Sequence, residues 1–105
     1  MIVVRVQFPV NIPDQEQFVK RMAATTPKYE GLAGLTRKYY VHSEDGKHAG
    51  GIYLWESKKH AEDWYTADWI TYMTQAWGEA PLLEYLDCPI VVDNELQKVT
   101  NKAVA

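Results

Sequence analysis

The sequence predicts an α+β protein with the ferredoxin-like order β-α-β-β-α-β, in which a four-stranded antiparallel sheet carries its helices on one face. Three observations lead to this prediction: an alternating apolar segment at the start, two strand-like segments joined by Asp45-Gly46, and capping residues ahead of both helical segments. A chain of 105 residues is long enough to bury one core and too short for two.

Residues 2–8, IVVRVQF, predict the first strand, because apolar side chains recur there with a period of two. This alternation gives one face made of Val4, Val6 and Phe8, and another made of Val3, Arg5 and Gln7. Asp14 then predicts the N-cap of a helix, with Gln17 at the capping-box position. Phe18 and Met22 follow at helical spacing, and we expect the helix to end before Pro27.

Residues 34–56, GLTRKYYVHSEDGKHAGGIYLWE, predict a hairpin, because Asp-Gly is a preferred dipeptide of tight two-residue turns. A turn at this dipeptide fixes the register of the two strands. The expected cross-strand pairs are His42 with Ala49, Tyr40 with Gly51, Lys38 with Tyr53, and Thr36 with Trp55.

The two faces of this hairpin differ in character. The more aliphatic face, which we expect beneath the helices, carries Tyr39, Val41, Ile52 and Leu54. The other face, which we expect to point away from the helices, mixes aromatic and polar residues: Lys38, Tyr40, His42, Tyr53 and Trp55. Such a face fits a dimer interface or the rim of a cavity. Gly51 leaves space opposite Tyr40, to be filled by a packed ring or by a ligand.

The second half of the chain predicts a helical region and a last strand. Ser57 caps a short helix, and residues 67–77 continue helically, with Asp68 as a possible restart and Pro81 as the end. One stripe of that helix carries Trp69, Tyr72, Met73, Ala76 and Trp77. Residues 82–92 predict the last strand, interrupted by Pro89. We therefore expect one domain over residues 1–92 and a C-terminal extension over residues 93–105.

Composition argues against several classes of protein. The net charge is −3 and no basic run exceeds two residues, so we expect no nucleic-acid partner. The single cysteine, Cys88, excludes an internal disulfide, and the three histidines lack metal-site spacing. The chain shows no nucleotide-binding motif, no signal segment and no membrane span. We expect a cytoplasmic protein without cofactor, metal or membrane contact.

With the hairpin defined, residues 30–65 resemble the ydhR-like mono-oxygenase family, in which a GGIYLF/W strand follows a polar hairpin. The trailing VVDNELQKVTNKA is similar to the C-terminal extension of that family. The resemblance implies a dimeric α+β barrel, with the homodimer built on the mixed aromatic face and residues 93–105 reaching over the partner. It also implies a cofactor-independent mono-oxygenase acting on an aromatic or polyketide-like small molecule, but it assigns no catalytic residue.

Candidate site residues follow from the chemistry of such a reaction, which needs a flat apolar site and removal of a proton. The candidates for catalysis are His42, Lys38 and Tyr53, where Lys38 could lower the pKa of the Tyr53 phenol. The candidates for substrate binding are Tyr40, Tyr53, Trp55, Trp64, Trp69 and Arg37. For each aromatic the alternative is plain core packing, the more common role of such residues, and for Arg37 it is a charge that extends to water, the interpretation we favour.

Two other functions stay open from the sequence. The same pocket could serve an isomerase or cyclase, or a non-catalytic, small-molecule-binding stress-response dimer. Haem binding through one histidine is conceivable, although no residue pattern selects it.

Overall fold

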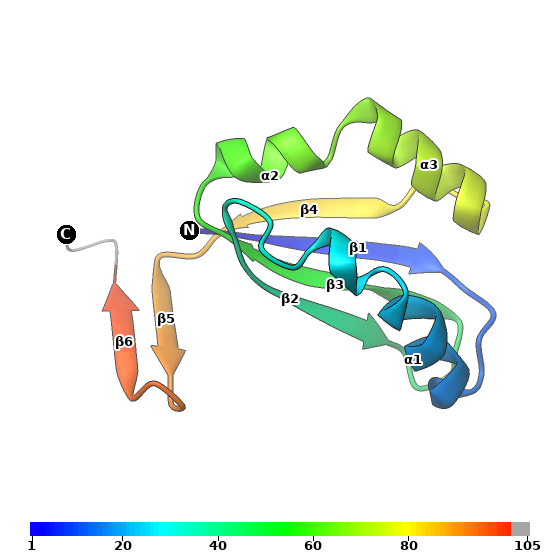
Figure 1. The fold of residues 1–105 in the computed structure, drawn as a ribbon, viewed down its shortest axis with the longest axis horizontal. Helices are drawn as coiled ribbons and strands as arrows, with labels where there is room; N and C mark the ends of the chain where they lie inside the picture. Colours follow the sequence, from blue (N-terminus) through cyan, green and yellow to red (C-terminus); the bar gives the residue numbers. More distant parts are fainter. Residues whose placement is uncertain (102–105) are drawn as a thin grey trace.

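The computed structural model describes residues 1–101 and confirms the predicted fold class. Four antiparallel strands form one sheet in the order β2-β3-β1-β4. Their bounds are Ile2–Pro9 (β1), Leu35–His42 (β2), His48–Trp55 (β3) and Leu82–Asp87 (β4). The helices are α1 (Gln15–Ala23), a 3₁₀ turn η1 (Thr26–Lys28), α2 (Lys58–Trp64) and α3 (Ala67–Trp77), and they lie on one face of the sheet (Figure 1).

The predicted assignment of the two sheet faces is wrong. Tyr53 and Trp55 are 3% and 1% exposed and belong to the core beneath the helices, whereas Tyr39 and Val41 are 54% and 42% exposed. The inner face of β1, with Val4 at its centre, carries only apolar side chains and lies beside the Tyr53 side of β3. Large rings gain more from burial than aliphatic side chains do, because they remove more surface from water.

The predicted hairpin register is confirmed over most of its length, but the predicted two-residue turn is wrong: β2 ends at His42, β3 begins at His48, and Gly46 N donates to the Ser43 carbonyl in the longer loop between them. Tyr40 pairs with Gly51, Lys38 with Tyr53, and His42 with Ala49. Near the open end a β-bulge between Leu35 and Arg37 shifts the register, so Leu35 and not Thr36 lies opposite Trp55. A bulge adds one residue to one strand, which the alternation of the sequence does not reveal.

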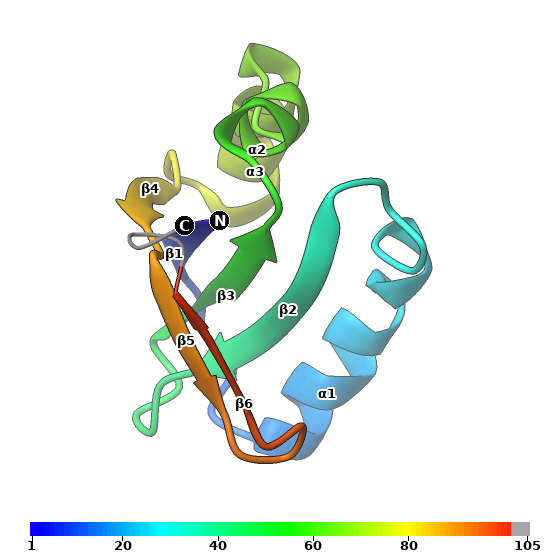
Figure 2. The same cartoon turned by 90° about the vertical axis from the view of Figure 1, so that its left-hand side faces the viewer.

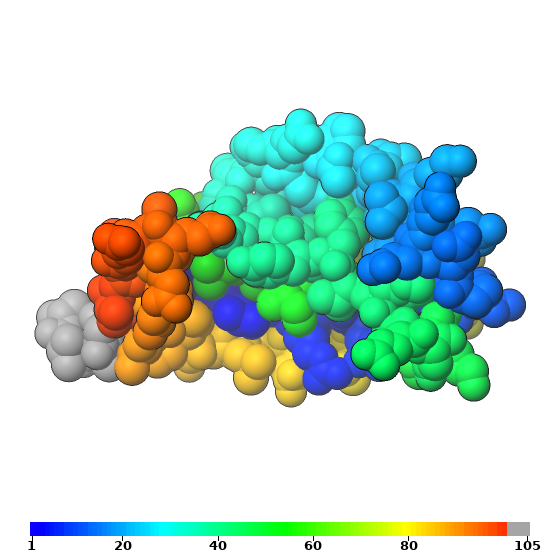
Figure 3. Space-filling view, turned by 90° about the horizontal axis from the view of Figure 1, so that it is seen from below, coloured from blue at the N-terminus to red at the C-terminus, as the bar shows by residue number. Residues whose placement is uncertain are grey.

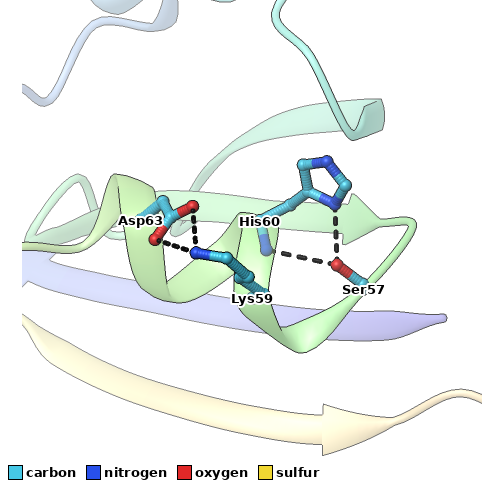
Figure 4. A network of polar contacts seen from close by, with 4 residues as sticks. All are labelled: Ser57, Lys59, His60 and Asp63. Carbon is cyan, nitrogen blue, oxygen red and sulfur yellow. Dashed lines mark hydrogen bonds and ion pairs between the residues drawn. The ribbon is translucent and has the colours of Figure 1, made fainter.

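Side-chain caps begin each of the three α-helices. Asp14 accepts a hydrogen bond from Glu16 N, and Ser57 accepts one from His60 N at 3.2 Å while its hydroxyl also lies 2.7 Å from His60 Nδ1 (Figure 4). Thr66, rather than Asp68, caps α3. Gly78, in the left-handed conformation, ends α3 three residues ahead of Pro81.

The predicted last strand divides into two. β4 ends at Asp87, and a separate two-stranded hairpin follows, made of β5 (Ile90–Asp93) and β6 (Lys98–Asn101). This hairpin stands at one end of the molecule, beside the open underside of the sheet (Figure 3). An ion pair of 3.2 Å joins Arg37 of β2 to Asp93. The expected extension over residues 93–105 ends in four residues outside the described part of the chain.

Candidate functional site

A cavity of about 530 Å³ lies between the sheet, α1 and α3. α1 stands on one side of this sheet face, and α2 and α3 stand on the other. The sheet forms the floor of the cavity between them (Figure 2). Volumes of this size are typical of small-molecule sites. The fold thus places one ligand-sized hollow on the face that carries the hairpin aromatics.

Aromatic rings and sulfur make up one wall of the cavity. All members of the stripe identified on residues 67–77 line the cavity: Trp69, Tyr72, Met73, Ala76 and Trp77. Phe8 on the sheet stacks with Trp77 at 4.8 Å between ring centroids. Such a wall offers flat apolar contact to a planar ligand.

Lys38 enters the opposite side of the cavity within a cage of tyrosines. Its Nζ lies 3.5 Å from the ring centroid of Tyr29, 3.8 Å from that of Tyr40 and 4.8 Å from that of Tyr53. Burial, and secondarily repulsion from Lys28, lower the pKa of Lys38 to about 7. The ring faces attract the ammonium form. Both protonation states of this amine are therefore accessible near neutral pH.

The phenols around Lys38 are held in their neutral form. Burial raises the pKa of Tyr53, Tyr29 and Tyr40 above the ordinary value. The Tyr53 hydroxyl donates to that of Tyr29 at 3.4 Å, and the hydroxyls of Tyr40 and Thr25 lie 2.6 Å apart. The sequence suggests that Lys38 could lower the pKa of the Tyr53 phenol. In the structure burial raises the pKa of that phenol, and burial lowers the pKa of the Lys38 amine.

The two adjacent glycines of β3 make this arrangement possible. A Cβ on Gly51 would lie 2.7 Å from Cε1 of Tyr53 and 3.2 Å from Cε of Lys38. A Cβ on Gly50 would meet the Val6 backbone instead, 2.8 Å from its carbonyl carbon. Gly51 therefore makes room for the ring and the lysine stem that line the cavity, and Gly50 for a neighbouring strand.

Several polar groups lie at the cavity wall besides Lys38. Within residues 1–101, Trp64 Nε1 is the one buried side-chain nitrogen or oxygen that lacks a hydrogen-bond partner. Burial raises the pKa of the nearby Tyr29 phenol, and the Trp64 indole opposes part of that rise. Arg21 lies 4.2 Å over the Trp77 ring, and Asp68 also faces the cavity. This indole nitrogen is enclosed by the protein beside the Tyr29 hydroxyl, while the Trp64 ring lines the cavity.

The structure brings together five of the residues selected from the sequence, all of which line the cavity: Lys38, Tyr40, Tyr53, Trp64 and Trp69. It places three others elsewhere. Trp55 is buried in the core and donates from Nε1 to the Tyr65 hydroxyl at 3.1 Å. His42 stacks on Phe18 with its Nε2 2.7 Å from the Ile12 carbonyl oxygen, and Arg37 pairs with Asp93 on the outer face.

Sequence reasoning missed Tyr29, Lys28 and Arg21. Tyr29 and Lys28 belong to the segment around Pro27, where no apolar period exists to give a direction to any side chain. Arg21 lies on an exposed side of α1 and reaches the cavity only by folding over Trp77. The stripe on α3 is the signal that the sequence offers: helical spacing marks one face of a helix but does not say that this face lines a cavity.

The described residues contain no group of three or more His, Cys, Asp or Glu side chains that could hold a metal ion. Within residues 1–101 no helix is long and apolar enough to cross a membrane.

These features define a small ferredoxin-like α+β protein with an aromatic-walled cavity. The sequence matches the family described as "Putative mono-oxygenase ydhR" over residues 3–80, and the chain belongs to this family. Its fold is similar to the crystal structure of a monooxygenase from the gene ActVA-Orf6 of Streptomyces coelicolor in complex with the ligand nanaomycin D. The identity is 19% and the TM-score 0.62, with 83% of this chain and 86% of the other covered. No curated protein matches the sequence.

Proposed function

We propose that this protein is a mono-oxygenase that uses dioxygen to oxidise a planar phenolic substrate bound in the cavity. The observation that carries the proposal is the cavity of about 530 Å³, with aromatic walls and the Lys38 amine inside it. Membership of the ydhR family supports the type of reaction, and the similar fold of a monooxygenase with a bound small molecule supports the place.

The reaction needs no external reductant when the substrate supplies all the electrons. A phenol with hydrogen on the carbon opposite its hydroxyl reacts with one O₂ to give a quinone and one water. The substrate loses four electrons and O₂ gains them, one oxygen atom entering the ring and the other leaving as water. The protein has to bind the ring, exclude water and control the hydroxyl proton.

The cavity residues divide these tasks among themselves. Trp69 and Trp77 supply flat surfaces for the substrate ring. The Trp64 ring lines the cavity beside them. The cofactor-free chemistry and the polyketide-like substrates expected from the sequence fit these groups and belong to this proposal.

We also propose that the protein forms a homodimer, but through the face opposite to the one expected from the sequence. The mixed aromatic face is covered by the chain's own helices, whereas the opposite face is open (Figure 3) and carries apolar side chains around the Arg5–Glu84 ion pair. Its apolar side chains include Val3, Tyr39, Val41, Ile52, Leu54, Leu82 and Leu86. The hairpin β5–β6 carries the exposed Ile90, Val92, Leu96 and Val99 beside this face, so a second sheet would cover both.

The cytoplasmic location stays a prediction.

Oxygen consumption tests the proposed activity. Hydroxylated naphthalenes and anthracenes should raise O₂ uptake, with a product 14 mass units heavier than the substrate and one ¹⁸O atom from ¹⁸O₂. Met73→Trp, which fills the cavity, should abolish the uptake, whereas Val19→Trp, on the exposed side of α1 away from the cavity, should keep it. Binding without uptake across the panel would contradict the proposal, and turnover without oxygen would indicate an isomerase or cyclase.

A further inference from the structure

We infer that the Lys38 amine takes the proton from the substrate hydroxyl and returns it to the oxygen that leaves as water. The inference rests on the proposed function and adds a catalytic residue to it. The geometry points to Lys38 because its amine lies in the cavity wall and, within residues 1–101, has no carboxylate partner.

The other basic groups at the cavity are less suited to this step. Arg21 cannot release its proton at physiological pH, and it lies over Trp77 on an exposed side of α1. Lys28 is exposed to solvent, 5.2 Å from the Tyr72 ring centroid. Lys38 alone among the three is enclosed, and enclosure in an apolar site disfavours its charged form.

The groups that surround Lys38 are almost all neutral or positive. From the elements packed around the cavity and the groove beside it, the titratable and charged groups are Arg21, Lys28, Tyr29, Glu30, Arg37, Tyr40, Tyr53, Asp68 and Tyr72. The two carboxylates, Glu30 and Asp68, form no ion pair with Lys38. The tyrosines next to the amine stay protonated, as shown above, so they are not alternative bases.

The amine also has a route to solvent. A second groove of about 270 Å³ lies on the outer side of the cavity, and both are lined by Tyr29, Lys38 and Tyr40. Thr26 and Glu30 line the groove alone. Lys38 therefore lies between the substrate site and an open groove. A proton accepted from the cavity can be exchanged with water without displacing the substrate.

The step balances in protons and electrons. The amine takes the hydroxyl proton and becomes an ammonium, and the phenolate transfers electrons to O₂ and forms a C–O bond with it. The ring C–H proton moves to the outer oxygen, the O–O bond breaks, and hydroxide leaves as the second carbonyl forms. The ammonium then protonates the hydroxide to water, which restores the neutral amine. The tyrosine faces stabilise the ammonium between these steps.

The test uses 4-nitrophenol as a probe, because its anion absorbs visible light and its nitro group blocks the position that would be oxidised. Bound to the wild type, the probe should ionise about one pH unit below its value in water. Lys38→Met should reverse this shift, whereas the control Lys59→Met, at an exposed α2 lysine, should behave like wild type. Lys38→Arg keeps a positive charge and should preserve the bound anion, but it should lower kcat for a true substrate about 100-fold.

The outcomes separate the inference from the proposed function. Unchanged probe ionisation in Lys38→Met, or wild-type kcat in Lys38→Arg, would overturn the role of Lys38 while leaving the oxygenase proposal intact. The expected probe shifts without O₂ uptake from any phenol would overturn the oxygenase proposal and support proton transfer to Lys38. A wild type that binds no phenol would overturn both. If Lys38→Met does not fold, the wild-type pH profile decides, because kcat/KM should fall below about pH 7 as the amine becomes protonated.

Discussion

Lys38 shows how one residue can combine two opposing physical effects. Its apolar surroundings disfavour the charge, whereas the faces of Tyr29, Tyr40 and Tyr53 favour it. The amine of an exposed lysine has a pKa near 10.5, so it is protonated at neutral pH and is a poor proton acceptor there. Enclosure changes this residue from a permanent cation into a group that titrates under physiological conditions.

The titration of Lys38 should appear in the stability of the protein. The unfolded chain keeps this proton up to about pH 10.5, whereas the folded chain loses it near pH 7. Between these values the unfolded state binds more protons, so the contribution of Lys38 to stability rises with pH. Lys38→Met should therefore stabilise the protein most at pH 6 and least at pH 10, as measured by urea unfolding. A stability difference that does not change with pH would contradict the lowered pKa.

The two adjacent glycines of β3 avoid two different close contacts, Gly51 with side chains and Gly50 with the backbone of β1. Gly51→Ala should destabilise the protein by about 1–3 kcal/mol, because the Tyr53 ring and the Lys38 stem have to move. Gly50→Ala should cost more, since the new methyl group would meet the backbone of β1. Urea unfolding of both variants measures the order, and an equal cost at the two positions would refute this difference.

At the scale of elements, capping decides where the second helical region begins and divides. Ser57 and Thr66 each accept a backbone N–H at the start of α2 and α3, so two short helices replace one longer one. The division turns α3 so that its aromatic stripe faces the sheet across the cavity. The cavity wall thus depends on a break between helices that the sequence marks with polar residues.

Removal of the Ser57 cap should weaken α2 specifically. Ser57→Ala leaves His60 N without its acceptor and should lower the free energy of unfolding by about 1 kcal/mol. Ser57→Asp retains an acceptor and should stay close to wild type. Thermal unfolding monitored by circular dichroism gives the comparison, and equal losses in both variants would argue that the hydroxyl acts through another contact.

The whole molecule has two sheet faces with different roles. The inner face holds the core and the cavity, and the outer face leaves Tyr39, Val41, Leu82 and Leu86 about half exposed. Exposed apolar side chains gathered on one sheet face, here around the Arg5–Glu84 ion pair, are typical of an interaction surface. The hairpin β5–β6 forms a separate sheet at one end of the molecule and projects to the side away from α2 (Figure 1).

A charge on the outer face should disrupt the proposed dimer. Light scattering of the wild type should give about twice the chain mass of 12.1 kDa. Tyr39→Glu should shift the mass to that of a monomer, with the dimer weakened at least about 100-fold, because each copy would bury an unpaired carboxylate. Val19→Glu, a matched change on the exposed side of α1, should leave the dimer intact. A monomeric wild type at micromolar concentration would contradict the interface.

The sequence by itself determined the local structure of this protein. Strand alternation, the chain reversal around Asp45-Gly46 and the caps Asp14 and Ser57 depend on neighbours in the chain, so their physical causes are visible in the letters. The hairpin register followed for the same reason, up to the bulge next to Arg37. Membership of the ydhR family was also recognisable from the GGIYLW strand.

Only the tertiary structure decided which side of the sheet the helices cover. Alternation divides a strand into two faces but does not say which one is inside, and here the inner face of β1 assigned Tyr53 and Trp55 to the core. The same choice placed Lys38, partly buried, among three rings from different segments and left Tyr39 exposed. The pKa of a lysine depends on how much water and charge surround it in space, and contacts between residues far apart in the chain set both.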